Sequence, residues 1–340
     1  MQCLFGFVFI LLLLRSGVSE ASDCESGAEN QPKVARTIWV DQSGKGDFTS
    51  VQKAIDSIPS YNNKWIRIYI SPGIYREKVT IPYDKPCILL EGTHSSLTTI
   101  EWNDYNETSE SATFSSFPDN IVAKAISFKN FYNIPPAVVD GNNPVVPAVA
   151  ARIYGDKSAF YNCGFFGLQD TLWDVEGRHY FHGCYIEGGI DFIFGSGQSI
   201  YESCAVNLTL GKYAPEYPYG FITAQGRNSS SDPSGFVFKT CAFLGSGETY
   251  LGRAYGPYSR VIIYRSVLSD MIVPAGWDAW DYAHHEGNFM YVEHGCRGAG
   301  ANTSGRVPWM TQLSAYQLSE FVNLSYIDKD GWIDKLPIQP

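Results

Sequence analysis

The chain has 340 residues, a formal net charge of −10, and a composition that is 44% hydrophobic and 15% aromatic. This content is sufficient for a large buried core, and the excess of acidic residues argues against a nucleic acid or an anionic membrane as partner, because either would be repelled. A neutral ligand or substrate is more compatible.

The N-terminus begins with an apolar run, Leu4–Leu14, followed by small residues near Ser19 and Ala21. This pattern is typical of a secretory signal peptide, and the run is shorter than the roughly 20 residues that cross a bilayer. Five N-glycosylation sequons also favour secretion. They begin at Asn106, Asn207, Asn228, Asn302 and Asn323.

One clear helix is predicted between Thr49 and Pro59. Thr49 and Gln52 have the pattern of a capping box, and Pro59 stops the helix. Three apolar residues share one face of this helix: Val51, Ile55 and Ile58.

A repeated motif follows, in which an aromatic residue stands three positions before a cysteine. The clear copies are FYNCGF, FHGCYI, YESCAV and FKTCAF, and degenerate copies occur at FKNFYN and YRSVLS. A spacing near 20 residues with insertions predicts a parallel β-helix, in which each coil of short strands stacks on the previous one. The N-terminal helix would cap its open end. The positions taken as equivalent are Phe131, Cys163, Cys184, Cys204, Cys241 and Val267.

The repeated cysteines are candidates for disulfide bonds. Equivalent positions in adjacent coils lie about 4.8 Å apart, one strand spacing. Cys163 with Cys184, or Cys204 with Cys241, would then lie within disulfide reach. The alternative is that unpaired cysteines fill interior positions of the stack.

Two aspartates share the same repeat position. Asp170 follows Cys163 by seven residues, and Asp191 follows Cys184 by seven. Two carboxylates one coil apart cannot both ionise freely, so one should have a raised pKa, and the pair could act as acid and nucleophile or as acid and base. Arg253 is the candidate cation that keeps Asp191 ionised. The alternative is that both aspartates lie in turns and hydrogen-bond their own backbone.

Six motifs in order resemble those of a known family. They are GIYREKV (73–79), GDKSAFYNC (155–163), LQDTLW (168–173), GGIDFIFG (188–195), LGRAYGPYSRV (251–261), and GW followed by W (276–280). Together they resemble the pectinesterases, or pectin methylesterases, of plant cell walls, from about residue 37 to the end.

The resemblance implies an all-β fold, a single-stranded right-handed parallel β-helix with the N-terminal capping helix. We accordingly divide the chain into a signal peptide at 1–21, a short segment at 22–36 and the pectinesterase catalytic domain at 37–340, without the inhibitor-like N-terminal domain of many plant members. It also implies a secreted, extracellular location in the plant cell wall. Methyl-esterified homogalacturonan is the expected substrate, a proteinaceous pectinesterase inhibitor is a candidate partner, and we expect a monomer.

The resemblance also assigns roles to four residues. Asp191 would be the nucleophile, Asp170 the general acid and then base, Gln169 an oxyanion donor, and Arg253 the group that orients Asp191 and contacts substrate. Asp191 would attack the methyl ester of a galacturonosyl unit, and Asp170 would protonate the departing methanol. No metal and no cofactor is required.

Aromatic residues in or beside these motifs are expected to line a sugar-binding cleft, although core packing is the alternative for each. They are Phe192, Trp173, Tyr255, Trp277 and Trp280. Thr108 resembles a substrate-contacting threonine of the family, but it also completes the Asn106 sequon.

The sequence departs from the family pattern at two positions. Pro147 stands where a glutamine donor to the oxyanion is usual, and loss of one such donor typically costs on the order of 100-fold to 1000-fold in rate. Tyr255 stands where a tryptophan is common, which reduces the stacking surface. The first departure motivates an alternative function, a pectin-binding homologue with little turnover.

Other enzyme classes fit less well. A pectate lyase usually requires a carboxylate cluster for Ca²⁺, and no such cluster accompanies the aspartate pair; a polygalacturonase is the other β-helix enzyme considered. No G-x-S-x-G elbow of a serine esterase occurs. The adjacent His284 and His285 are better explained as a solvated pair than as metal ligands.

Overall fold

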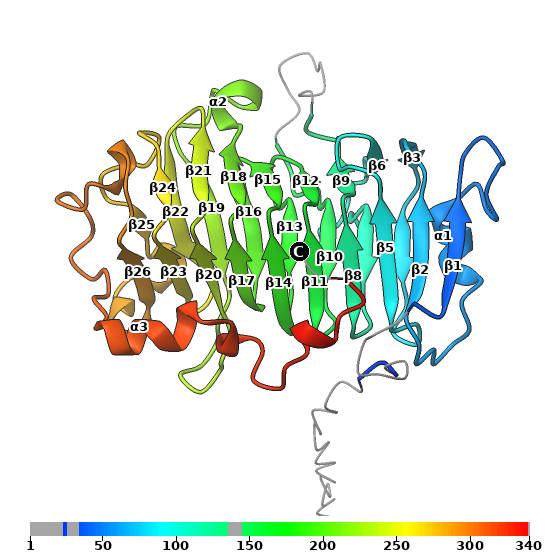
Figure 1. The fold of residues 1–340 in the computed structure, drawn as a ribbon. Coiled ribbons are helices and arrows are strands. Elements are labelled where there is room, and N and C mark those ends of the chain that lie inside the picture. The colour runs from blue at the N-terminus through cyan, green and yellow to red at the C-terminus, as the bar shows by residue number, and fades with distance from the viewer. Residues whose placement is uncertain (1–22, 26–33, 135–144, 339–340) are drawn as a thin grey trace, which may run out of the picture.

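The protein is a solenoid of three parallel β-sheets, as the computed structural model in Figure 1 shows. The structure describes residues 23–25, 34–134 and 145–338, so the predicted signal peptide lies outside the described residues. Successive strands pass from one sheet to the next, and neighbours within each sheet pair in parallel. This arrangement confirms the predicted parallel β-helix.

The described residues form sheets A, B and C. Sheet A has ten strands: β1 (Arg36–Val40), β2 (Ile66–Ile70), β5 (Ile88–Gly92), β8 (Ile121–Lys124), β11 (Ser158–Tyr161), β14 (Arg178–His182), β17 (Gln198–Glu202), β20 (Gly235–Lys239), β23 (Arg260–Tyr264) and β26 (Met290–His294). Sheet B has eight: β3 (Gly73–Arg76), β6 (Thr98–Trp102), β9 (Ser127–Asn130), β12 (Gly164–Phe166), β15 (Tyr185–Gly188), β18 (Ala205–Leu208), β21 (Ala242–Gly245) and β24 (Val267–Leu268). Sheet C has eight: β4 (Val79–Ile81), β7 (Phe114–Ser116), β10 (Ala151–Ile153), β13 (Leu172–Asp174), β16 (Ile190–Gly195), β19 (Gly220–Gln225), β22 (Thr249–Ala254) and β25 (Trp277–Asp278).

The aromatic residues of the repeat form a stack inside the solenoid. The rings of Phe160, Phe181, Tyr201 and Phe238 lie in successive coils, with centroids 4.9, 4.5 and 4.6 Å apart and nearly parallel planes. All four are fully buried. These spacings match the distance between strands, so the repeat places one ring above another and fills the interior.

The residue before each repeated cysteine turns the chain from sheet A to sheet B. Asn162, Gly183, Ser203 and Thr240 all have positive φ, between 52° and 64°. This left-handed conformation is costly for a non-glycine residue, and for Thr240 most of all because its side chain is β-branched. The turn directs the following cysteine into the core.

The register corrects two of the equivalent positions. Gly164 pairs with Ser127, which places Ile126, not Phe131, in line with Cys163. Ala242 pairs with Val267, so Ser266 is in line with Cys241. Both errors came from degenerate copies in which no cysteine marks the turn.

The disulfide predictions are wrong. Cys163, Cys184, Cys204 and Cys241 are buried free thiols, and the disulfide in the described part of the chain joins Cys24 to Cys87. Stacked residues of parallel strands keep their Cβ atoms near one strand spacing, about 4.8 Å, whereas a disulfide requires about 3.8 Å. The alternative of unpaired interior cysteines therefore holds.

The predicted helix is present as α1 (Val51–Asp56), but its N-cap is Ser50 instead of Thr49. The Ser50 side chain accepts a hydrogen bond from the Lys53 amide. The carboxylate of Glu77 also accepts from the first amides of the helix, a contact from β3's coil that the local sequence does not reveal. In Figure 1, α1 lies at the N-terminal end beside β1 and β2, as expected of a cap.

Among the described residues, the remaining helices are α2 (Leu210–Tyr213), α3 (Ala315–Val322) and five 3₁₀ turns: η1 (Trp280–Tyr282), η2 (Glu286–Asn288), η3 (Ala299–Ala301), η4 (Leu324–Tyr326) and η5 (Ile333–Lys335). The C-terminal segment from α3 onward runs back across sheet A (Figure 1), and its apolar side chains pack on the outer face of that sheet. In the described part of the chain, no helix has the length and apolar character needed to cross a membrane.

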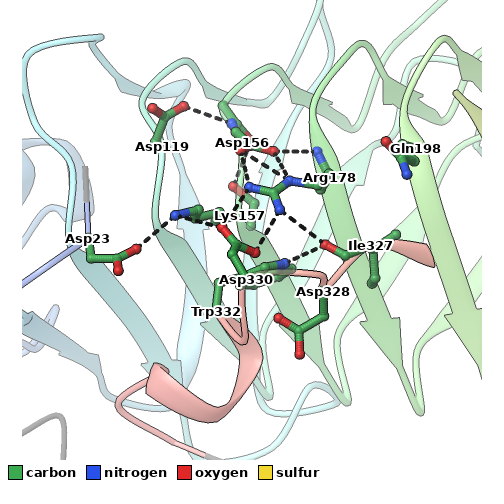
Figure 2. Close-up of polar contacts among 12 residues, drawn as sticks. Asp23, Asp119, Asp156, Lys157, Arg178, Gln198, Ile327, Asp328, Asp330 and Trp332 are labelled. Carbon is green, nitrogen blue, oxygen red and sulfur yellow. Dashed lines mark hydrogen bonds and ion pairs between the residues drawn. The ribbon is translucent and has the colours of Figure 1, made fainter. Parts of the chain in front are cut away.

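Ion pairs fasten this C-terminal segment to the solenoid (Figure 2). Arg178 donates to Asp330 of this segment at 2.8 Å and to Asp156 of the solenoid at 2.7 Å, and Lys157 lies 3.2 Å from Asp330. These residues border a hollow of about 1300 Å³ between the segment and the corner of sheets A and C. Neither Asp170 nor Asp191 lines this hollow.

Candidate active site

Asp170 and Asp191 lie in line on adjacent coils. Leu172 pairs with Ile193, and Gln169 forms a bridge with Ile190, which fixes the register across the two aspartates. The Asp170 amide donates to the Ile190 carbonyl at 3.0 Å. The juxtaposition predicted from the repeat is therefore confirmed.

A β-bulge gives Asp191 its direction. The register between β16 and β19 shifts between Ile190 and Ile193, and Asp191 within this bulge has a φ of 47°. Bulges next to functional sites commonly re-aim a side chain. Gly188 makes the bulge possible, because a Cβ there would lie 2.2 Å from the Cβ of Phe192. Asp170, just before β13, also has a positive φ, of 60°.

Arg253 on β22 binds Asp191 with two hydrogen bonds. Its Nε donates to Oδ1 at 2.7 Å and its Nη2 donates to Oδ2. The guanidinium lies between two rings, 4.2 Å from the centroid of Phe221 and 3.9 Å from that of Trp280. Two parallel bonds and two flanking rings fix its orientation.

The two carboxyl groups differ in protonation. Burial, followed by the negative charge of Asp191, raises the pKa of Asp170 to about 8. Burial also raises the pKa of Asp191, but the hydrogen bond and the charge of Arg253 oppose this shift. Asp170 therefore carries a proton at neutral pH and Asp191 is the ionised partner, the arrangement of an acid and a nucleophile.

Gln169 lies beside the pair with its side chain available. It is partly exposed, and no hydrogen bond to its amide group occurs among the described residues. Its carbonyl accepts from the Ala148 amide at 3.2 Å, which places Pro147 in the coil directly before it. Pro147 has neither a side-chain donor nor a backbone N–H, so of these two residues only Gln169 offers a side-chain amide donor.

Two aromatic side chains flank Arg253 on the surface. Tyr255 is 52% exposed and Trp280 is 37% exposed, and their rings stack with centroids 5.7 Å apart. Trp280 was expected only as one of several aromatics; its contact with Arg253 makes it a direct neighbour of the Arg253–Asp191 pair.

Two predicted substrate contacts are buried in the core. Phe192 is 0% exposed and Trp277 is 1% exposed. The bulge at Asp191 turns the acid outward and sends Phe192 inward. Trp277 stacks on Tyr291 at 4.5 Å and donates to Glu293. For both residues, core packing replaces the expected cleft position.

Trp173 lies on the same coil as Asp170, and Thr108 lies in a turn of an earlier coil, between β6 and β7. Trp173 is partly exposed and stacks on Phe194 at 5.1 Å. Thr108 is partly buried in a turn whose Ser109 carbonyl accepts from Arg152 at 2.6 Å. Arg152 also lies over the Trp173 ring, 4.7 Å from its centroid, and is a residue that the motif comparison did not identify.

The sequon asparagines are accessible to different degrees. Asn106, Asn228, Asn302 and Asn323 are exposed, whereas Asn207 is partly buried within β18. Among the described residues, no three His, Cys, Asp or Glu side chains form a group suited to a metal ion. His284 and His285 are exposed.

Comparisons with known proteins agree with this site. The family model Pectinesterase matches residues 37–330. Probable pectinesterase 29 of Arabidopsis thaliana is 51% identical over 301 residues, covering 88% of this chain and 90% of the relative. Putative pectinesterase 10 of Arabidopsis thaliana is 50% identical over 331 residues, covering 97% of this chain and 96% of the relative.

Solved structures give the same result. The pectin methylesterase from carrot superposes with a TM-score of 0.82 at 28% identity, covering 93% of this chain and 99% of that one. The Aspergillus niger pectin methylesterase superposes with a TM-score of 0.73 at 27% identity, covering 92% and 98%. With its right-handed parallel β-helix and its matched motifs, the chain belongs to the pectinesterase family.

Proposed function

We propose that this protein hydrolyses the methyl esters of homogalacturonan to give pectate and methanol. The observation that carries the proposal is the pair of aligned aspartates, of which only Asp191 is bound by Arg253. Family membership and the two pectin methylesterase structures support it. Family members act on cell-wall pectin, and we propose that this one is secreted into the cell wall.

In the first half-reaction, an ionised oxygen of Asp191 attacks the ester carbon. Gln169 donates to the oxyanion that develops, and the bond from carbon to the methoxy oxygen breaks as Asp170 gives its proton to the departing methanol. The product is an acyl-enzyme on Asp191. A raised pKa makes Asp170 suited to this step because it is protonated at neutral pH.

In the second half-reaction, Asp170 is a carboxylate and accepts a proton from water. The resulting hydroxide attacks the acyl carbon, the bond to Asp191 breaks, and the free galacturonate leaves. Asp170 is then protonated again and Arg253 again binds the Asp191 carboxylate. Every proton is returned, and the residues present are sufficient for both steps.

Pro147 motivates the second candidate, a pectin-binding protein with little turnover. The paired geometry of Asp191 and Arg253 and the unbonded amide of Gln169 favour turnover, because one oxyanion donor remains. A lower rate than in a protein with both donors is the expected consequence.

Methanol release from methyl-esterified pectin tests the proposal. Wild type should release methanol, Asp191→Ala should not, and Asp334→Asn should match wild type because Asp334 is an exposed residue of the C-terminal segment. Wild type no faster than Asp191→Ala would leave the binding protein as the explanation. Culture-medium recovery of a tagged full chain tests secretion, size-exclusion chromatography tests the expected monomer, and pull-down with a proteinaceous pectinesterase inhibitor tests that candidate partner.

A further inference from the structure

We propose that Arg152 binds the free carboxylate of a galacturonate unit next to the unit being de-esterified, so that the protein prefers partly demethylated polymer. The inference rests on the proposed function and names the form of the substrate that the same face recognises.

Arg152 and Arg253 stand at the two ends of one column on sheet C. Arg152 pairs with Trp173, Trp173 with Phe194, Phe194 with Ala224, and Ala224 with Arg253. Four strand spacings of about 4.8 Å separate the two arginines, or about 19 Å. The aspartate pair lies on the coils between them, so both cations border the same surface.

The two arginines differ in their partners. Arg253 is bound to the carboxylate of Asp191, whereas no Asp or Glu among the described residues forms an ion pair with Arg152. Its hydrogen bonds go to neutral oxygens, the Ser109 carbonyl at 2.6 Å and the Tyr154 hydroxyl at 3.1 Å. In a chain with a net charge of −10, a partly exposed arginine without a counter-ion is suited to an anionic ligand.

Aromatic rings hold this guanidinium in place. Its central carbon lies 4.7, 4.9 and 5.4 Å from the ring centroids of Trp173, Tyr154 and Phe117. Tyr83, which is 68% exposed, contacts Phe117 with its ring tilted and the two centroids 5.0 Å apart. Stacking preserves the charge and orients the planar fork, and the exposed rings add surface on which a sugar can stack.

Arg152 lies too far from the nucleophile to contact the reacting ester. It is one coil before Asp170 and is aligned with a residue three positions after it, which is roughly 10 Å along the strand direction. Its guanidinium leans on Tyr154, farther from the pair. A carboxylate that it binds therefore belongs to a neighbouring unit of the polymer, and hydrolysis itself produces such carboxylates.

A purely structural role is the competing explanation, since Arg152 also fixes the turn at Ser109. The two roles predict different effects on the binding of esterified and unesterified ligands. A turn support affects esterified and unesterified ligands alike, whereas a carboxylate site affects only the unesterified one and is weakened by salt.

Calorimetric titration of Asp170→Asn protein with equal-length unesterified and fully methyl-esterified oligogalacturonates separates the two. This background keeps the neutral charge of protonated Asp170 and prevents turnover. Adding Arg152→Gln should weaken binding of the unesterified oligomer about tenfold and that of the esterified oligomer by less than about twofold. Arg152→Lys should retain part of the preference, and the exposed Arg36→Gln should retain all of it.

Equal weakening for both oligomers, or no weakening for either, would overturn the inference. If Arg152→Gln lowers the unfolding temperature, two other measurements test the inference: binding by the Arg152→Lys protein and the salt dependence of binding by the Asp170→Asn protein. A preference for the unesterified oligomer that does not shrink with added salt would also overturn the inference. The experiment measures binding and not methanol release, so its result can be interpreted even if the proposed esterase activity is absent.

Discussion

Arg253 binds the carboxylate of Asp191 and not that of Asp170, although the two aspartates lie in line on adjacent coils. The asymmetry arises because the bulge in β16 turns Asp191 toward Arg253 on β22. Asp170, just before β13, forms no such ion pair among the described residues. One arginine thus separates two otherwise equivalent acids into a proton donor and an anion.

The pH dependence of activity should report this separation. Asp170 must be protonated to act as the acid, so kcat/KM should fall as pH rises through about 8, where burial and Asp191 place its pKa. It should also fall in acid as Asp191, whose pKa is raised by burial, becomes protonated. Initial rates of methanol release from pH 4 to pH 10, corrected with Asp191→Ala blanks, check this. A rate that still rises above pH 9 would contradict the assignment of Asp170.

Asp170 should also limit stability at high pH. Its pKa in the folded protein is raised above its usual value, so its contribution to stability is fully present below about pH 4 and is lost as pH rises through about 8. Asp170→Asn removes this ionisation. The unfolding temperature of the variant relative to wild type should therefore increase from pH 4 to pH 9; a constant difference would be inconsistent with burial of a titrating acid.

Restoring the missing amide should raise the rate. Pro147→Gln places a donor in the coil before Gln169, and we expect kcat to increase by about tenfold or more, because one oxyanion donor contributes on the order of 100-fold to 1000-fold when well placed. Pro147→Ala is the matched control, since it adds a backbone N–H and no side-chain donor. An equal gain in both variants would assign the effect to the backbone.

Tyr255 and Trp280 should differ in their effects. Tyr255→Ala removes an exposed ring and should raise KM about 3- to 10-fold with little change in kcat. Trp280→Ala should lower kcat as well, because its ring lies 3.9 Å from the guanidinium carbon of Arg253. Tyr316→Ala, which removes a still more exposed ring on α3, is the control. Identical kinetic changes in the first two variants would argue against a specific role for Trp280.

Asp330 should stabilise the fold at neutral pH. Its contacts with Arg178 and Lys157 lower its pKa to about 2 even though burial opposes the shift. Its contribution is therefore present above about pH 4 and is lost as pH falls to about 2. Because Asp330 is 43% exposed, Asp330→Asn should cost less than about 1 kcal/mol. Thermal unfolding between pH 7 and pH 1.5 should show a difference between variant and wild type that is constant above about pH 4 and shrinks progressively below it; a difference that does not shrink would point to another cause.

The sequence was most informative where the repeat is most regular. Counting from Cys163 and Cys184 aligned the two aspartates because no insertion separates those coils. The same counting failed at Phe131, where the copy lacks a cysteine and the register differs. The motifs located Gln169 and Arg253 because the family resemblance spans both.

Features set by long-range geometry were not accessible in this way. Strand alternation does not reveal the bulge that sends Phe192 inward, since the bulge depends on pairing with β19. The Cys24–Cys87 disulfide joins the N-terminal segment to the coil of β5, outside the repeated motif. Arg152 has no distinctive local pattern, and its importance depends on rings from three other coils.

The C-terminal segment changes how a stack of coils can come apart. Coils that touch only their neighbours can unravel from either end one at a time. Here Lys335 forms an ion pair with Asp23, which precedes the disulfide-bonded Cys24. The Tyr326 hydroxyl donates to the Pro233 carbonyl, just before β20. The C-terminal segment thus connects several coils along the length of the solenoid. These coils cannot separate until the segment detaches, so they are expected to unfold together as one unit.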